Sequence, residues 1–269
     1  MNLLFTQPFK ARKPFHRDLI ALWTILYKEI YRFMRIWPQT VLPAAVTTSL
    51  YFLIFGSLIG QRVGSMRGLP YMDYIVPGVA LMTIITNSYS NVVSSFYSSK
   101  FQRNIEELLT SPVPNWVILT GYVGGGVARG LAVGSVVVAI GSFFSNIQFL
   151  HPGVVIAVFL LTATLFALAG FINAIFANSF DDISIIPNFI LTPLVYLGGV
   201  FYSIDMLPGF WQKVSLFNPI LHMVNAFRYG FLGISDIDVV LALEVCSGCV
   251  FSLGLIALFL LHRGVGLKS

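Results

Sequence analysis

Residues 130–180 form an uncharged run of 51 residues, GLAVGSVVVAIGSFFSNIQFLHPGVVIAVFLLTATLFALAGFINAIFANSF, and this run decides the fold class. A membrane-spanning helix needs about 20 mainly apolar residues, so the run is long enough for most of two crossings. Polar and helix-breaking residues interrupt it near its middle, at Asn146, Gln148, His151, Pro152 and Gly153. The run therefore predicts two transmembrane helices joined by a short polar turn.

The composition of the whole chain agrees with this class. Hydrophobic residues make up 57% of the 269 residues and charged residues only 10%, whereas a soluble domain has roughly 45–50% and about 25%. So few charges cannot cover so much apolar surface in water. The composition excludes a soluble enzyme, a disordered chain and a coiled coil, and it predicts an all-α membrane protein with several spans.

Further uncharged intervals bracket the remaining spans, because charges are costly inside the bilayer. The sequence predicts six transmembrane helices at residues 38–60, 76–98, 115–144, 153–176, 184–203 and 239–261, of which the third contains Arg129. The uncharged stretch at residues 214–227 is too short to cross and contains Asn218-Pro219. We expect it to belong to a re-entrant or interfacial hairpin, at about residues 204–232, on the outer side.

Basic residues set the expected orientation. Seven of the sixteen Lys and Arg residues lie within the first 35 residues, and Lys100 and Arg103 lie in the second predicted loop on the same side. Cytoplasmic flanks carry the excess of basic residues. The sequence therefore predicts that both termini are cytoplasmic, with a basic extension at residues 1–17 and a tail at residues 262–269.

Residues 18–37 have the pattern of an amphipathic helix. Apolar side chains recur at helical spacing, and Lys28, Arg32 and Arg35 fall on the opposite, polar face. Such a helix is suited to lie in the membrane interface. Two interpretations stay open: a plain anchor on the membrane surface, or a lever beneath a cytoplasmic partner.

A second amphipathic segment, at about residues 99–111, lies in the second cytoplasmic loop. Its predicted apolar face carries Phe101, Ile105 and Leu108, whereas Arg103, Glu106 and Glu107 lie off that face, and prolines follow the segment. A short exposed helix of this kind fits a groove of another protein. The alternative is a solvated loop that covers lipid headgroups.

The segment KFQRNIEELLTSP at residues 100–112 resembles the coupling helix of the ABC-2-type transporter permeases. The run PLVYLGGVFY at residues 193–202, with Leu207-Pro208, Asn218-Pro219 and Arg228, resembles the fifth span and outer hairpin of that family. Six spans in residues 38–261 and an N-terminal interface helix also fit the pattern. The resemblance covers nearly the whole chain and is strongest to the YadH-type branch of bacterial inner-membrane permeases.

The resemblance implies a half-transporter. Two copies of the chain would pair with two copies of a separate ATPase, which would hold the ATP and Mg, and this chain would bind no cofactor. The sequence contains no G-x-x-x-x-G-K-[ST] segment, which agrees with an ATP site on another chain. The expected function is ATP-driven export of a hydrophobic or amphiphilic substrate across the inner membrane, with membrane lipid but no nucleic acid as a further partner.

Other functions remain alternatives of different classes. An ATP-independent carrier or channel, or a membrane scaffold, would also be a polytopic helical protein. A membrane-embedded enzyme would gather His, Cys, Asp or Glu at depth, and the scattered histidines have no metal-ligand spacing. The sequence therefore predicts neither a catalytic nor a metal site, and it does not identify the substrate, which could be a drug, a lipid or a glycan.

Polar residues within the spans are candidates for a substrate path. Asn87 and Asn91 lie in an unusually polar second span, which indicates either a wet path or hydrogen bonds between helices, and Arg129 could either pair within the bundle or meet an anionic headgroup. Glycines at positions 121, 125, 126, 130 and 134 have the spacing that lets helices approach closely, so we interpret them as packing residues.

The outer hairpin region is rich in aromatic residues. Its candidate residues are Phe201, Tyr202, Trp211 and Arg228. An interfacial aromatic belt is the ordinary explanation for such a cluster. The more specific alternative is a gate through which an amphiphile leaves the bundle.

Overall fold

The computed structural model describes residues 14–266, and most of them are helical. The N-terminal half contains α1 (Pro14–Arg35), α2 (Trp37–Tyr51), the π-helix η1 (Phe52–Ile59), α3 (Gly60–Val63), the antiparallel strands β1 (Ser65–Met66) and β2 (Leu69–Pro70), α4 (Tyr71–Phe101), α5 (Asn104–Thr110) and α6 (Asn115–Phe144). The C-terminal half contains α7 (Pro152–Phe176), α8 (Asp182–Ile186), the π-helix η2 (Pro187–Leu191), α9 (Thr192–Tyr196), the 3-10 helix η3 (Ile204–Met206), α10 (Gly209–Leu216), α11 (Pro219–Leu232) and α12 (Val239–Arg263).

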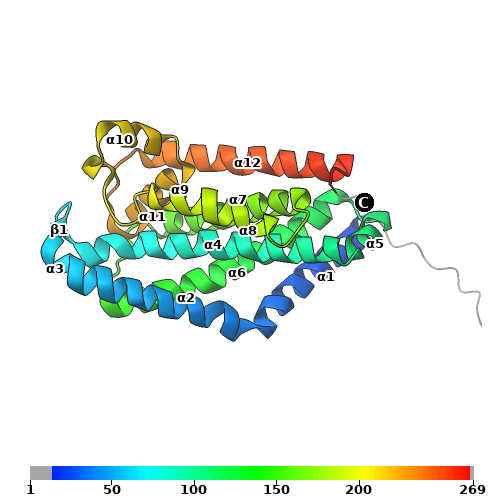
Figure 1. The fold of residues 1–269 in the computed structure, drawn as a ribbon, viewed down its shortest axis with the longest axis horizontal. Coiled ribbons are helices and arrows are strands. Elements are labelled where there is room, and N and C mark those ends of the chain that lie inside the picture. Colours follow the sequence, from blue (N-terminus) through cyan, green and yellow to red (C-terminus); the bar gives the residue numbers. More distant parts are fainter. Residues whose placement is uncertain (1–13, 267–269) are drawn as a thin grey trace, which may run out of the picture.

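The long helices run side by side along one axis (Figure 1). Helix α5 and the C-terminal end of α12 lie at one end of this bundle, which we call the α5 end, whereas β1 and α10 lie at the opposite end, the α10 end. Helices α1 and α2 form a bent pair along one side of the bundle. Most of the N-terminal extension predicted at residues 1–17, and residues 267–269 of the predicted tail, lie outside the described residues.

Four helices in the described chain are long and apolar enough to cross a bilayer, at Trp37–Val63, Asn115–Phe144, Pro152–Phe176 and Val239–Arg263. They coincide with four of the predicted spans to within three residues at each end. Helix α4 has a more polar sequence and is not among them, nor is the shorter apolar helix Asp182–Tyr196. The chain is therefore an all-α membrane protein.

Helix α4 occupies the middle of the bundle. It extends over Tyr71–Phe101 rather than residues 76–98, and both α6 and α7 pack against it through glycines. A Cβ at Gly126 or Gly130 of α6 would collide with Val92 or Ser88 of α4, and one at Gly170 of α7 would lie 2.6 Å from the backbone oxygen of Tyr89. Small residues thus let the three backbones approach closely, which confirms packing as the role of these α6 glycines.

The segment predicted as a span at residues 184–203 is helical only over Asp182–Tyr196. Fifteen residues reach about 22 Å at 1.5 Å per residue, which is less than the hydrocarbon thickness of about 30 Å. The chain turns at Gly198 and Gly199, and Gly199 has a φ of +70°. Within the helix, the π-helix η2 lies just before Pro193, and Thr192 Oγ1 donates a 2.9 Å hydrogen bond to the carbonyl of Pro187, five residues earlier. In a regular α-helix the proline ring would clash with the carbonyl four residues earlier, and the wider π-helical turn relieves that clash.

The region predicted as an outer hairpin contains two short helices. Helix α10 is largely exposed, whereas α11 is buried along most of its length among α4, α7 and α12. Asn218 is the N-cap of α11, because its Oδ1 accepts a 3.0 Å hydrogen bond from the backbone N–H of Ile220. Helix α11 therefore belongs to the bundle, and α10 lies on its surface at the α10 end.

Candidate functional site

The predicted coupling helix at residues 99–111 is shorter in the structure, and its first residues belong to α4. Phe101 ends α4, a turn follows, and Arg103 adopts a left-handed conformation with φ 60°, so that α5 covers only Asn104–Thr110. A left-handed residue cannot continue a right-handed helix. Phe101 and Arg103 therefore lie beside α5 rather than on one face of it.

Helix α5 has one buried face and one exposed acidic face. Ile105 is 1% exposed and joins the core, and Leu108 packs against the same core. Glu106 and Glu107 are both exposed, in the first turn of the helix. Carboxylates are favourable there because they face the positive end of the helix dipole. The arrangement holds α5 against the bundle and leaves two negative charges available to a partner.

The end of α4, which precedes α5, is held against α7 and the loop that follows it. Lys100 Nζ donates 2.7 Å hydrogen bonds to the carbonyls of Ile175 and Ala177, at the C-terminal end of α7. The ring of Phe101 lies 5.2 Å from that of Phe180 between centroids. Asp182 accepts hydrogen bonds from the backbone N–H groups of Asn178 and Ser179, which lower the pKa of its carboxyl below its usual value. The loop between α7 and α8 is therefore tied to the end of α4.

Helix α1 begins at Pro14 and ends at Arg35, so the interface helix predicted at residues 18–37 is shifted toward the N-terminus. Ile36 separates it from α2, which begins at Trp37 and carries Pro38 in its first turn. Lys28 and Arg35 are exposed, as predicted for a polar face. Arg32 was expected on that same face, but the structure places it half-buried against α4.

A buried polar network joins α1 to α4. Glu29 is 1% exposed and accepts a 2.7 Å hydrogen bond from Ser95 Oγ and an ion pair at 3.3 Å from Arg32 Nη2. The same Nη2 donates to the backbone oxygen of Asn91 at 3.0 Å and to its Oδ1 at 2.9 Å. In this structure Asn91 is thus fully buried as a partner of Arg32, not part of the groove described below, in which Asn87 lies.

The sequence interpretation missed Glu29. Its side chain lies on the face of α1 that packs against glycines of α6, where a Cβ at Gly125 would collide with Glu29 and one at Gly121 would lie 2.5 Å from Ile25 Cγ2. A signal was available, since Glu29 follows Ile25 and precedes Phe33 by four residues each and so shares their face. Exposed aromatic side chains of α1 lie on other faces, at Trp23, Tyr27 and Tyr31.

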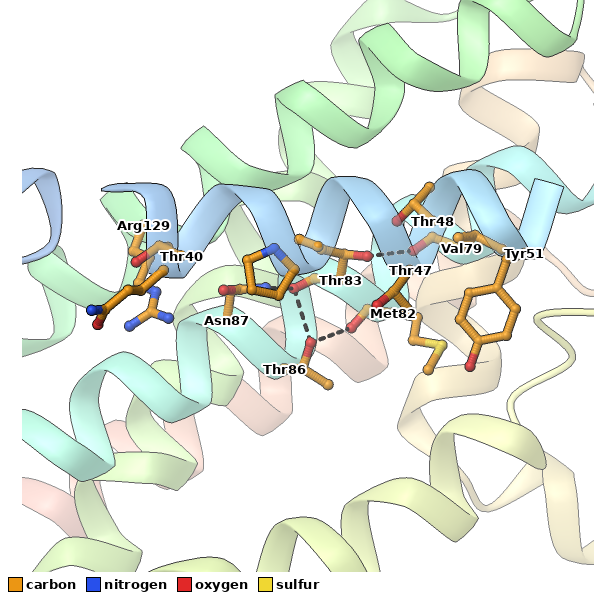
Figure 2. Close-up of a pocket in the computed structure, with 13 residues that line it drawn as sticks. Thr40, Thr47, Thr48, Tyr51, Val79, Met82, Thr83, Thr86, Asn87 and Arg129 are labelled. Carbon is orange, nitrogen blue, oxygen red and sulfur yellow. Dashed lines mark hydrogen bonds between the residues drawn. The ribbon is translucent and has the colours of Figure 1, made fainter. Parts of the chain in front are cut away.

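A groove of about 290 Å³ lies between α2 and α4, with Arg129 of α6 at one end. Thirteen residues line it: Gln39, Thr40, Pro43, Ala44, Thr47, Thr48, Tyr51, Val79, Met82, Thr83, Thr86, Asn87 and Arg129. Figure 2 shows the guanidinium of Arg129 beside Asn87 and Tyr51 at the far end. The groove thus brings together two of the three residues predicted for a substrate path.

Arg129 has no hydrogen-bond or ion-pair partner among residues 14–266, and its Nε is buried. A charged arginine at the centre of a membrane helix costs about 2.5–3.5 kcal/mol on insertion scales. Such a charge is normally paired within the bundle or faces water or a ligand. The part of the chain that the structure describes supplies no such partner for Arg129.

The four candidate residues of the outer region separate into three places. Phe201 stacks on Phe55 at 4.8 Å, and Tyr202 donates its hydroxyl to the carbonyl of Tyr196 at 2.8 Å. Trp211 lies on the exposed helix α10. Arg228 is 1% exposed, so it belongs to the core and not to an outer surface.

Arg228 joins α11 to the turn after α9. Its Nη2 donates to the carbonyl of Gly199 at 2.8 Å, its Nε donates to the carbonyl of Tyr74 at 3.3 Å, and its guanidinium lies 3.7 Å from the centre of the Tyr74 ring. Nearby, Asp236 accepts a 3.0 Å hydrogen bond from Ser203 Oγ and forms an ion pair with Arg67, whose Nε lies 2.9 Å from its Oδ1. No spacing in the sequence indicates a role for Asp236, since its partners Ser203 and Arg67 lie in distant loops.

Among residues 14–266 there is no group of three or more His, Cys, Asp or Glu side chains that could hold a metal ion. The polar clusters that exist are ion pairs and hydrogen bonds between helices. The arrangement offers two places for binding. One is the exposed acidic helix α5, and the other is the hydroxyl-lined groove that contains Arg129.

Comparison with known proteins identifies the family. Residues 20–232 match the model of the ABC-2 type transporter family. The chain is 56% identical over 255 residues to the inner membrane transport permease YadH of Escherichia coli (strain K12), covering 94% of this chain and 99% of that protein. It is also 26% identical over 212 residues to nodulation protein J of Sinorhizobium fredii (strain NBRC 101917 / NGR234), covering 78% of this chain and 79% of that protein.

These matches extend over α1 to α11 and include both the acidic helix α5 and the groove. Together with the long apolar helices, they place the chain in the inner membrane as a multi-pass protein. The chain therefore belongs to the ABC-2 type transporter family, as a transmembrane transport component.

Proposed function

We propose that this chain is the permease subunit of an ATP-driven exporter, in which two copies pair with two copies of a separate ATPase. The observation that carries the proposal is α5, a short helix at the end of the bundle that exposes Glu106 and Glu107 while Ile105 anchors it. The substrate in this proposal is a hydrophobic or amphiphilic molecule that moves outward across the inner membrane.

The contacts of α5 support a coupling role. Ile105 belongs to the same core as α4, and Lys100 and Phe101 connect the end of α4 to the loop after α7. A force on α5 would therefore act on the C-terminal end of α4. The network of Glu29 and Arg32 would pass the same movement to α1.

The proposal includes a six-span topology with both termini in the cytoplasm. The six spans are the four apolar helices together with α4 and the segment at residues 184–203, whose helical part, Asp182–Tyr196, covers about 22 Å of the crossing. Helix α5 and the C-terminal end of α12 lie at one end of the bundle (Figure 1), which agrees with this topology. On α4, Thr86 and Ser90 are exposed, and a polar surface of this kind is costly against lipid, which supports a second copy or a water-filled path on this side.

The experiment is purification of the tagged chain from its native membrane in mild detergent, followed by assay of ATP hydrolysis and identification of the chains bound to it. We expect an ATPase in roughly 1:1 ratio with the wild-type chain. The double variant Glu106→Arg with Glu107→Arg should lose it, because it reverses the charge that α5 presents while leaving Ile105 in place.

The matched control is a double charge reversal at the opposite end, Arg62→Glu with Lys213→Glu, since both side chains are exposed there. It should retain the ATPase. Retention of the ATPase by the α5 variant would contradict the coupling assignment. A wild-type chain that carries no nucleotide-binding partner would instead favour an ATP-independent carrier or channel, or a membrane scaffold.

A further inference from the structure

The groove between α2 and α4 is polar along one part and aromatic at one end. Five of its thirteen lining residues are threonines, and Asn87 adds an amide. Tyr51 at the far end lies 5.8 Å from Phe55 and 5.7 Å from Phe201 between ring centroids, so an aromatic cluster continues from that end. A molecule with a polar head and an apolar chain matches both parts.

The hydrogen-bond donors of α4 that line the groove are already used, whereas the guanidinium of Arg129 has no partner among the described residues. The hydroxyls of Thr83 and Thr86 donate to carbonyls of their own helix, and Asn87 Nδ2 donates to the carbonyl of Thr83 at 3.0 Å. Their hydrogens are therefore used within α4. The strong donor left at this end of the groove is the guanidinium of Arg129, with its five N–H groups.

The charges around Arg129 leave a net positive site. No acidic residue lines the groove. The charge of Arg32 of α1 acts on Arg129, and the carboxylate of the Arg32 network, Glu29, is already bound by Arg32 and Ser95. Two guanidiniums and one carboxylate meet where α1, α4 and α6 pack together. A bound anion would supply the missing counter-charge.

We propose that this groove binds the anionic head of an amphiphile, of the phosphate-monoester or phosphodiester type, with Arg129 as its counter-ion and the acyl chain toward Tyr51. Arginine forms bidentate hydrogen bonds with phosphate oxygens. The threonine hydroxyls line the groove through which such a head would reach Arg129. The head could belong to the transported molecule or to a resident phospholipid. The first case rests on the proposed function, and the second does not.

The test measures binding to the purified chain in dodecyl maltoside, a neutral detergent, by native mass spectrometry. The probes are dodecyl phosphate and dodecanol, which share one chain and differ in the charged head. We expect saturable binding of dodecyl phosphate to the wild-type chain and none of dodecanol. Arg129→Gln should weaken binding of dodecyl phosphate at least tenfold, and Arg129→Lys should restore part of it.

Arg62→Gln is the matched control, because it removes an exposed arginine of α3, far from the groove, and it should bind as the wild type does. Equal binding by the wild type and Arg129→Gln would overturn the inference. If Arg129→Gln fails to fold, Arg129→Lys and the two probes still decide it: equal binding of phosphate and alcohol by the wild type also overturns the inference.

Two further arms distinguish the source of the head. In nanodiscs, retention of phosphatidylglycerol by the wild type but not by Arg129→Gln supports a resident lipid. Stimulation of ATP hydrolysis by dodecyl phosphate in the assembled complex, lost in Arg129→Gln, supports the transported molecule. Because the binding arms need no ATPase, their failure overturns only this site, whereas loss of the coupling result overturns only the proposed function.

Discussion

Helix α4 and the segment Trp37–Val63, which contains α2, lie on the two sides of the groove, and the more apolar of the two is the less buried. Helix α4 carries serines, threonines and asparagines, yet 20 of its 31 residues are buried. In α2 only Thr40 and Thr48 of 15 residues are buried, although α2 is part of the apolar segment Trp37–Val63. In a bilayer the apolar helix can face lipid, whereas a polar helix has to be enclosed.

The difference extends to how the two helices are held. Glycines of α6 and α7 bring their backbones against α4, and buried hydrogen bonds such as that of Tyr89 with Asn173, at 2.7 Å, connect it to α7. Helix α2 has no comparable close approach by a glycine of α6 within the described chain. We therefore expect substitutions on the faces of α4 to cost far more than those on α2 or on the surface of α12.

The largest expected effect is that of Gly130→Leu. A Cβ at this position already collides with Ser88, and the leucine adds further atoms between α6 and α4. We expect a loss of roughly 3 kcal/mol or more, at the upper end of overpacking effects, and loss of most folded protein. Size-exclusion chromatography of the solubilised chain measures this.

Gly248→Leu is the control for that substitution, since nothing lies within 4 Å of a Cβ at Gly248 of α12. It should give a wild-type elution profile. A monodisperse Gly130→Leu protein with wild-type thermal stability would show that α6 does not pack tightly on α4.

The second prediction compares two arginines of the bundle. Arg228→Met leaves the carbonyls of Gly199 and Tyr74 without their donor, at an expected cost of about 3 kcal/mol. Arg129→Met removes a charge that has no partner in the described chain, so its stability should be unchanged or higher. Thermal unfolding of both variants in detergent tests this, and an equal loss in both would mean that Arg129 is paired in the folded protein.

A smaller effect is expected for Glu29→Gln. The amide oxygen can still accept from Ser95, but the ion pair with Arg32 is lost, and we expect a destabilisation of about 1 kcal/mol. Glu244→Gln on α12 is the control, because Glu244 is exposed. Unfolding curves for the two variants that coincide would contradict a role for Glu29 in holding α1 to α4.

Much of the fold follows from the positions of charges alone. The uncharged intervals predicted α6, α7 and α12 to within two residues at each end. They also located α4, but with ends that were too short, because Asp73 and Lys100 lie within the helix and limit the interval. The segment at residues 184–203 was predicted too long, since glycines that turn the chain carry no charge and look like part of a span.

The candidate site was only partly predictable, because helical periodicity gives the faces of one helix but not the helix that each face meets. Arg32 was expected on the polar face of its helix together with Lys28, yet it donates a hydrogen bond to Asn91 of α4. Glu29 and Asp236 were missed for the same reason, since the serines that donate to them, Ser95 and Ser203, are more than 30 residues away in sequence. The groove could not be predicted at all, as it requires the relative placement of α2, α4 and α6.

The most direct test of the coupling role is a photo-crosslinking amino acid at position 106 of α5 in living cells, with position 213 of α10 as the matched site at the other end of the bundle. Both side chains are exposed. We expect light-dependent crosslinking from position 106, and not from 213, to a chain that binds an ATP analogue. Crosslinks from position 106 to lipid alone, with no nucleotide-binding chain captured, would contradict the account.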